Sequence, residues 1–257
     1  MGVFIRAHRS DGMLTPDLDG RTALVTGSAK GVGRELLLAI ADHGADVAVH
    51  YNTSADAAAE VAEAARERGA TATTVQGDVT DPDAVDAIFE RVAADLGHVD
   101  VLVNNVGAFA PSYWEDIDYE TWRTVMTTNF DATCLCSKRA LPAMREGSWG
   151  RIVNVGYATA ERTYVDPVNF PYYVAKAGVI MFTRMLAAET QDDGITVNAV
   201  SPYTVENSEE FPEDLPRGRP ASFEDMQQAL LFFLDEDSDY ISGENVEVDG
   251  GLVPERL

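Results

Sequence analysis

Short runs of apolar and β-branched residues alternate along this chain with longer stretches whose apolar positions recur at helical spacing. The short runs predict strands and the longer stretches predict helices. The predicted strands are Thr22–Thr26, Asp46–His50, Thr71–Gln76, Val99–Val103, Arg151–Val155, Ile195–Val200 and Asn245–Val248. The predicted helices are Val32–His43, Ala55–Arg68, Asp83–Leu96, Tyr119–Met144, Tyr172–Glu189 and Phe223–Leu234.

This alternation predicts an α/β fold. Strands that are apolar throughout are typical of a parallel sheet covered on both faces, and regular strand–helix alternation gives a doubly wound sheet. The 257 residues contain no linker rich in Gly, Ser or Pro. We therefore expect one Rossmann-type domain over residues 21–257, with seven parallel strands and helices on both faces. Residues 1–20 are expected to be a loosely ordered N-terminal extension.

The segment from Thr22 to Gly33 joins the first predicted strand to the first predicted helix through a glycine-rich turn. Gly27, Gly31 and Gly33, spaced G-x3-G-x-G, would let the backbone turn tightly and approach an anion. The free N–H groups at the helix N-terminus would then face a phosphate. The turn indicates a nucleotide site, although glycine-rich turns also occur without a ligand.

Polar and glycine residues also follow other predicted strands. In a doubly wound sheet, ligands bind at the carboxyl ends of the strands, where the strand order reverses. We therefore expect these segments to meet there: Asp78-Val79, Asn104-Asn105-Val106-Gly107, Gly156 to Thr159, and Pro202.

Tyr172 and Lys176 lie four residues apart on a predicted helix, so they share one face. A phenol has an ordinary pKa near 10 and must lose its proton more readily to exchange it near neutrality. A neighbouring ammonium would lower that pKa by favouring the phenolate. The alternative is an ordinary packed tyrosine beside a solvated lysine.

Together, the glycine turn, the Asn-Asn-Val-Gly segment and the Tyr-x-x-x-Lys pair resemble the short-chain dehydrogenase/reductase family. The resemblance extends from Arg21 to Leu252 and includes a closing segment from Ile241 to Gly251. It implies an NAD(P)-dependent oxidoreductase that transfers hydride between nicotinamide and a small carbonyl or alcohol substrate. It also implies a homodimer or homotetramer that pairs the two long predicted helices.

The resemblance implies a role for individual residues. Tyr172 would be the general acid/base, Lys176 its partner and a ribose ligand, and Asn129 the holder of a relay water. Residues matching the family's cofactor-binding positions are Thr26, Gly27, Ser28, Gly31, Val32, Gly33, Asp78, Val79, Asn105, Gly107, Tyr172, Lys176, Pro202 and Val205.

The chain departs from the family pattern after its fifth and sixth predicted strands. Direct alignment puts Tyr157 where the family has a serine that hydrogen-bonds the substrate carbonyl. Thr159 lies 13 residues before Tyr172, close to the usual separation, so we favour Thr159 for this role, with Tyr157 as the alternative. The family's Pro-Gly reads Pro202-Tyr203 here.

The end of the second predicted strand favours NADP(H) over NAD(H). An acidic residue there would hold the ribose 2′-hydroxyl and repel a 2′-phosphate. After His50 this chain has Tyr51 and Asn52, with no carboxylate before Asp56, and Lys30 supplies a base in the glycine turn. We expect a reductase similar to the 3-oxoacyl reductases. A pteridine-reductase-like C=N reductase and a non-catalytic NADP-binding protein are the alternatives.

Charge and composition limit the remaining possibilities. With 19 basic and 43 acidic side chains, the net charge is −24, which disfavours nucleic acid and anionic membranes as partners. Acidic residues spread over the whole chain indicate a cytosol of very high salt, and an acidic protein of ordinary salt is the alternative. No apolar run of about 18 residues and no signal-peptide core is found, so we expect a cytoplasmic protein. The four histidines show no metal-ligand spacing, so no metal is expected.

Overall fold

A parallel sheet of seven strands organises the described part of the chain. The computed structural model describes residues 15–161, 168, 170–208 and 211–252. The sheet order is β3-β2-β1-β4-β5-β6-β7, with every neighbouring pair parallel. The strands are β1 (Thr22–Val25), β2 (Asp46–Tyr51), β3 (Ala72–Gln76), β4 (Val101–Asn104), β5 (Gly150–Val155), β6 (Ile195–Pro202) and β7 (Asn245–Val248). The order reverses between β1 and β4, which confirms the predicted doubly wound sheet.

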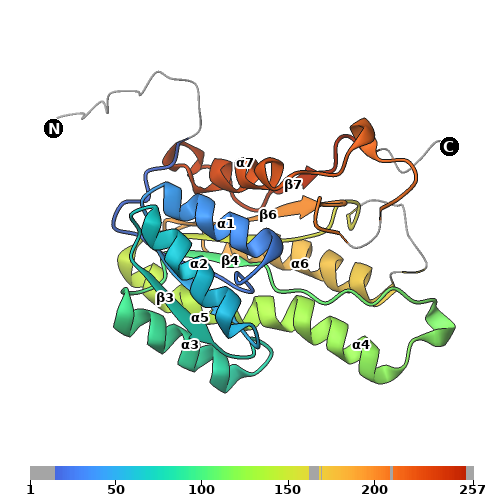
Figure 1. The fold of residues 1–257 in the computed structure, drawn as a ribbon, viewed down its shortest axis with the longest axis horizontal. Coiled ribbons are helices and arrows are strands. Elements are labelled where there is room, and N and C mark those ends of the chain that lie inside the picture. The colour runs from blue at the N-terminus through green and yellow to red at the C-terminus, as the bar shows by residue number, and fades with distance from the viewer. Residues whose placement is uncertain (1–14, 162–167, 169, 209–210, 253–257) are drawn as a thin grey trace.

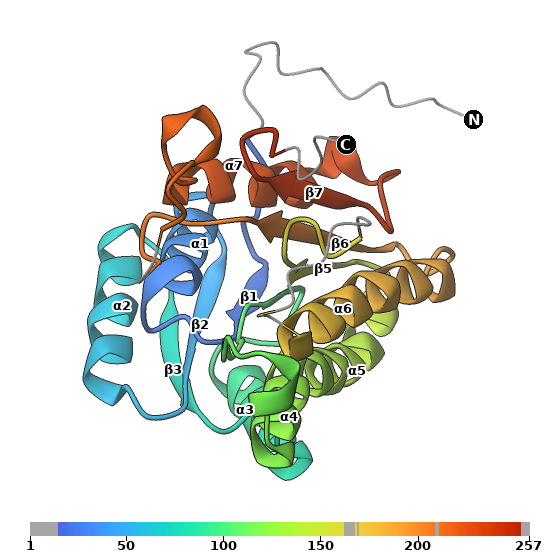
Figure 2. The same ribbon diagram turned by 90° about the vertical axis from the view of Figure 1, so that its right-hand side faces the viewer.

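Helices cover both faces of this sheet, as Figures 1 and 2 show. On one face lie α1 (Gly31–Asp42), α2 (Ala55–Glu67) and α7 (Phe223–Leu234). On the other lie α3 (Pro82–Asp95), α5 (Ala132–Gly147) and α6 (Phe170–Glu189). The shorter α4 (Tyr119–Met126) projects beyond the sheet and packs beside α6. Each face has its own core of buried aliphatic side chains.

Local sequence explains where several helices begin. The Asp81 carboxylate accepts the Asp83 N–H ahead of α3, and Pro82 occupies the first turn, where its missing N–H costs nothing. Ser222 and Asp225 form a reciprocal capping box at the start of α7. These caps fix the entry of each helix next to the strand that precedes it.

The long helix predicted over Tyr119–Met144 is interrupted. Between α4 and α5 the residues Thr127–Asp131 form a π-helical turn, and a turn of this kind is often found at functional sites. It carries Asn129, which is fully buried. The sequence periodicity predicted one continuous helix because a single widened turn shifts the helical phase only slightly.

Residues preceding β1 also contribute to the fold. Within the predicted N-terminal extension, Leu18 is buried in the core, and its N–H donates to the His43 carbonyl at 2.9 Å. Residues 1–14 of that extension lie outside the described residues.

A chain of buried polar side chains lies under the carboxyl ends of β4 and β5. The Asn104 amide donates to Ser137 Oγ at 3.0 Å and to Asn154 Oδ1 at 2.8 Å. The Asn154 amide in turn donates to Thr183 Oγ1 at 2.9 Å. These bonds tie two central strands to α5 and to α6, and α6 carries Tyr172 and Lys176.

Two kinds of feature are absent from the described residues. No helix there is long and apolar enough to cross a membrane. In the same residues no group of three or more His, Cys, Asp or Glu side chains is placed to hold a metal ion.

Candidate active site

The glycine turn between β1 and α1 leaves room for backbone only. Gly27 has φ +68° and Gly31 has φ +58°, a region that residues with a Cβ rarely adopt. A Cβ at Gly33 would lie 2.5 Å from the Asn105 amide nitrogen and 2.6 Å from the Gly27 carbonyl oxygen. The three glycines therefore form a tight backbone cradle at the N-terminus of α1, which fits an anionic group such as a pyrophosphate.

Thr26 joins this turn to the segment that follows β4. The Thr26 hydroxyl oxygen accepts the N–H of Asn105 at 2.9 Å and the N–H of Val106 at 3.1 Å. The Asn105 amide donates to the Thr26 carbonyl at 2.9 Å. The two segments that border the point of strand reversal are thus held together by three hydrogen bonds.

His50 joins the same turn to β2 and β3. Its Nδ1 accepts the Gly27 N–H at 2.9 Å, so the ring proton lies on Nε2, which donates to the Gly77 carbonyl at 3.1 Å. Ser28 exchanges two more hydrogen bonds with the His50 backbone, both of 3.0 Å. This role of His50 was not predicted from the sequence. The available signal was an aromatic polar residue at the end of an otherwise apolar strand.

Burial lowers the pKa of His50. The ring is only 2% exposed, so its charged form loses solvation. The hydrogen bond to Gly77 and the charge of Asp78 act in the opposite direction and are weaker. The neutral ring is the form that can accept the Gly27 N–H, so its titration is coupled to the shape of the turn.

A pocket of about 460 Å³ opens beside the turn. It brings together six of the residues predicted to bind a cofactor: Gly27, Lys30, Tyr51, Asn52, Asp78 and Val79. Its polar lining and its position at the ends of β1, β2 and β3 suit the adenosine part of a dinucleotide. The predicted ligand Ser28 is instead fully buried, and its hydroxyl accepts the His50 N–H.

Lys176 and Asn129 meet at Gly107. A Cβ at Gly107 would lie 2.7 Å from Asn129 Oδ1 and 3.7 Å from Lys176 Nζ. The Asn129 amide donates to the carbonyls of Ala108 and Val125, both at 2.8 Å. Its Oδ1 is buried and finds no partner among the described residues. Such an orphan acceptor fits the predicted role of holding a water molecule.

Tyr172 lies one turn before Lys176 on α6. The Lys176 Nζ donates to the Val155 carbonyl at 2.7 Å and lies 5.6 Å from the centroid of the Tyr172 ring. Because Val106 is bound to Thr26 and Gly107 contacts Lys176, one short segment connects the glycine turn to this pair.

Burial acts against the lowering of the Tyr172 pKa that is expected from Lys176. Burial raises the pKa of the Tyr172 phenol and lowers that of the Lys176 ammonium to about 8. Both shifts come from desolvation, which disfavours whichever form is charged. The lysine directs its nitrogen to a backbone carbonyl, and that geometry leaves desolvation dominant. Tyr172 therefore keeps its proton in this environment.

The structure separates the roles of Tyr157 and Thr159. The Tyr157 ring lies 5.3 Å from the Tyr172 ring, centroid to centroid, at an interplanar angle of 71°. The Thr159 hydroxyl is buried and hydrogen-bonds the Tyr173 hydroxyl, while its backbone N–H donates to Glu247 at 3.0 Å. The geometry favours Tyr157 over Thr159 as the side chain beside Tyr172.

Three predicted positions remain, two of them at or just after the end of β6. Pro202 ends the strand, and the buried Val205 donates its N–H to Ser208 Oγ at 3.2 Å. Val32 lies in the first turn of α1, next to the glycine cradle.

Known proteins are similar to this chain over most of its length. A family model described as Enoyl-(Acyl carrier protein) reductase matches residues 27–253. The 3-oxoacyl-[acyl-carrier-protein] reductase FabG of Staphylococcus aureus strain Mu50 is 31% identical over 242 residues, 90% of this chain and 98% of that protein. The Escherichia coli K12 FabG is 31% identical over 246 residues, 92% and 98% of the two chains.

Solved structures are similar to this chain over about nine tenths of its length. The landomycin C-6 ketoreductase LanV with bound NADP and rabelomycin has a TM-score of 0.84 and 32% identity, covering 92% of this chain and 97% of its own. The acetoin dehydrogenase YohF from Salmonella typhimurium has a TM-score of 0.83 and 30% identity, covering 90% and 95%.

The coupling of His50 to the turn predicts a pH-dependent contribution to stability. In the unfolded chain His50 titrates near 6.5, above its value in the folded protein. Its contribution is therefore complete above pH 6.5 and is lost as the pH falls towards the folded value. At pH 8 we expect His50→Asn to lower the free energy of unfolding by about 1–3 kcal/mol, because the Gly77 carbonyl loses its donor.

Urea unfolding at pH 8, 6.5 and 5.5 checks this prediction. The gap between wild type and His50→Asn should narrow as the pH falls, whereas the exposed His98→Asn should match wild type throughout. A gap of constant size from pH 8 to 5.5 would contradict the coupling.

Proposed function

This chain belongs to the short-chain dehydrogenase/reductase family, and from that premise we propose that it is an NADPH-dependent reductase of a carbonyl group. The matched family model and the similar proteins are described as reductases or dehydrogenases, and they include a ketoreductase. The observation that carries the proposal is the meeting of Lys176, Asn129 and Gly107 beside Tyr172, next to the glycine cradle.

The described residues fit a nicotinamide dinucleotide. Gly27, Gly31 and Gly33 would hold its pyrophosphate, and the pocket formed with Lys30 and Asp78 would hold its adenosine part. LanV, which is 32% identical, was solved with NADP bound. When bound, the reduced cofactor supplies the hydride, and the protein orients and tunes the reaction.

Tyr172 acts as the general acid. As the carbonyl carbon gains hydride, its oxygen becomes negative and takes the phenolic proton. Burial keeps Tyr172 protonated until that negative oxygen forms, which suits a proton donor. Lys176, whose pKa is about 8, carries its charge at neutral pH and stabilises the phenolate that remains.

Asn129 returns the proton to Tyr172 through solvent. Its buried Oδ1 is fixed by two amide hydrogen bonds on the other side of the carboxamide, so a water held there has a defined position. Lys176 lies next to the same space, which provides a path from the phenol to the relay water. The π-helical turn aims the Asn129 side chain at this point.

Two alternatives remain distinguishable by assay. A pteridine-reductase-like enzyme would oxidise NADPH with dihydropterins, and a non-catalytic NADP-binding protein would bind NADPH without turnover. A panel of ketones, 3-oxoacyl thioesters and dihydropterins separates these from the proposal. The panel is run in dilute buffer and in molar KCl, because the acidic composition favours function at high salt.

Removal of the proton donor tests the proposed reaction. We expect Tyr172→Phe to lower kcat at least a hundredfold, because general acid catalysis contributes about 10²–10⁴. NADPH affinity, measured by fluorescence titration, should change less than about threefold, since the phenol hydroxyl is needed for chemistry. Tyr240→Phe, at a fully exposed position, is the matched control. Near-normal turnover by Tyr172→Phe would rule out the assignment.

The choice of coenzyme is tested by comparing NADPH with NADH. Lys30 is exposed at the entrance to the adenosine pocket, where no carboxylate follows β2 directly, so kcat/KM should favour NADPH over NADH at least tenfold. Lys30→Ala should reduce that preference, while the exposed Lys138→Ala on α5 should preserve it. The Lys30 effect should weaken in molar KCl, which screens charges over about 3 Å. A preference for NADH would reject this part of the proposal.

We also propose that α5 and α6 form a subunit interface of a homodimer or homotetramer. Met181 and Met185 on α6 are 56% and 67% exposed, which leaves an apolar face uncovered in the single chain. Light scattering should give at least twice the chain mass of 27.8 kDa, and Met185→Glu should shift it towards monomer. A monomeric wild type would refute this interface.

A further inference from the structure

Resting on the proposed function, we propose that the substrate is an uncharged ketone attached to a flat aromatic ring system. The aromatic rings packed against Tyr172, and the charge on the exposed segment between β4 and α4, both favour such a substrate over the linear, anionic thioesters of an acyl carrier.

Aromatic rings flank the general acid on both sides. The Phe109 ring lies 5.1 Å from the Tyr172 ring at 86°, and the Tyr157 ring lies 5.3 Å from it on a different segment. Tyr203 continues the series, 6.3 Å from Tyr157 at 37°. These three rings follow β4, β5 and β6, the strands whose carboxyl ends border the site. A carbonyl that reaches the Tyr172 hydroxyl therefore brings its neighbouring atoms against aromatic surface.

More aromatic surface lies on the exposed segment before α4 and at the start of α6. Phe109 is 58% exposed and Trp114 is 62% exposed, although large apolar side chains usually avoid water. The Trp114 ring lies 4.9 Å from that of Phe170, two residues before Tyr172 on α6. Phe109 thus extends the aromatic surface from the Tyr172 ring to solvent, and Trp114 and Phe170 form a second exposed pair of rings. Aromatic rings attract one another in edge-on and offset arrangements, by about 0.5–1.5 kcal/mol for each pair.

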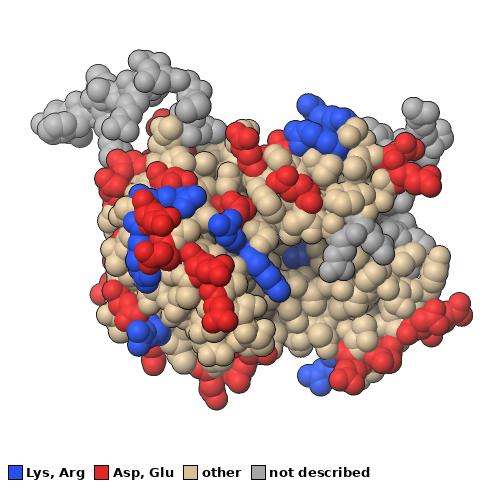
Figure 3. Space-filling model, viewed as in Figure 1, with Lys and Arg blue, Asp and Glu red and all other residues tan. Residues whose placement is uncertain are grey.

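Negative charge on the same exposed segment, which continues into α4, opposes an anionic carrier. Four exposed carboxylates follow Trp114 in the sequence, with one arginine nearby: Glu115, Asp116, Asp118 and Glu120, and Arg123. Figure 3 shows acidic side chains along the lower right edge, where Figure 1 places α4. Phosphates of a thioester carrier would approach against this charge and against the overall charge of −24.

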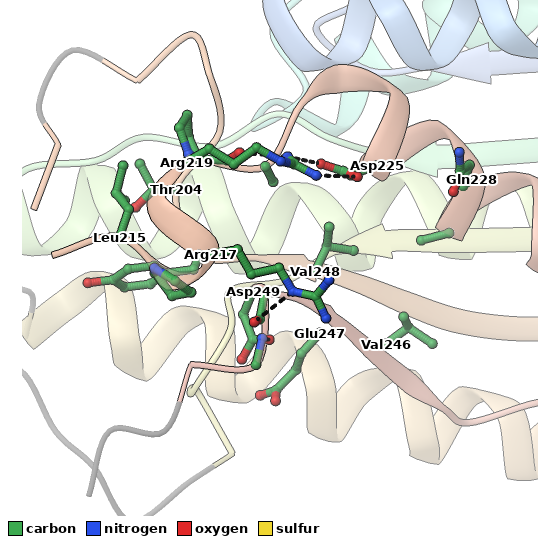
Figure 4. A pocket seen from close by; sticks show the side chains of 17 residues that line it. Thr204, Leu215, Arg217, Arg219, Asp225, Gln228, Val246, Glu247, Val248 and Asp249 are labelled. Atoms are coloured by element: carbon green, nitrogen blue, oxygen red, sulfur yellow. Dashed lines mark hydrogen bonds and ion pairs between the residues drawn. The ribbon is translucent and has the colours of Figure 1, made fainter. Parts of the chain in front are cut away.

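Arg217 and Arg219, which line a pocket together with Tyr203, do not form a free basic surface. This pocket has a volume of about 460 Å³. Arg219 holds the Asp225 carboxylate with two nitrogens, and the Arg217 Nε donates to the Gly250 carbonyl, as Figure 4 shows. Glu247 and Asp249 line the same pocket. Its positive charge is largely balanced, so this pocket gives a phosphate little attraction.

A matched pair of ketones tests the inference. 2-Tetralone and 2-decalone share one bicyclic carbon skeleton, and only the first has an aromatic ring. We expect kcat/KM with NADPH to be at least tenfold higher for 2-tetralone, and higher for it than for acetoacetyl-CoA. Tyr157→Leu should reduce the tetralone-to-decalone ratio to threefold or less, while Tyr157→Phe should retain the ratio, because it retains the ring.

Controls separate this inference from the proposed function. Tyr240→Leu removes a fully exposed ring elsewhere and should leave the ratio unchanged. If Tyr157→Leu fails to fold, the half-exposed Phe109→Leu provides the same test. Turnover of ketones with a ratio near one, or with acetoacetyl-CoA preferred at low and molar KCl, overturns the aromatic substrate and leaves the reductase in place. NADPH binding without oxidation by any ketone overturns both.

Discussion

The close approach of the glycine turn to its neighbouring strands is the constraint on which the rest of this site depends. Thr26 binds the segment after β4, and His50 binds Gly27 from the end of β2. At Gly33 a single added carbon would collide with both the turn and Asn105. The backbone N–H groups of the turn are therefore held in one arrangement, and the segment that continues to Gly107 places the catalytic side chains relative to them.

Burial gives the site its chemistry as well as its shape. The same desolvation that raises the pKa of Tyr172 lowers that of Lys176 to about 8, so at neutral pH the phenol stays protonated while the lysine still carries its charge. A site of this kind holds its proton donor ready and stabilises charge most strongly when the substrate oxygen becomes negative. The buried Oδ1 of Asn129 adds a polar acceptor that has no hydrogen-bond partner among the described residues.

Family and substrate are decided by different parts of the molecule. The cradle, the Tyr172–Lys176 pair and Asn129 are proposed to form the machinery that the family shares, and they say little about what is reduced. The rings of Phe109, Tyr157 and Tyr203 lie on the loops that follow β4, β5 and β6. Loops can vary while the sheet remains, so substrate preference changes there without disturbing the cofactor cradle.

Much of this protein follows from sequence alone, because the relevant signals are local. Apolar periodicity gave the strands and helices, glycine spacing gave the cradle, and a spacing of four put Tyr172 and Lys176 on one face. Tertiary structure decided the rest. His50 contacts a turn 23 residues away, Tyr157 rather than Thr159 lies against Tyr172, and burial overrides the effect of Lys176 on the phenol. Each of these depends on contacts or desolvation between segments that the linear pattern does not relate, so only the folded chain determines them.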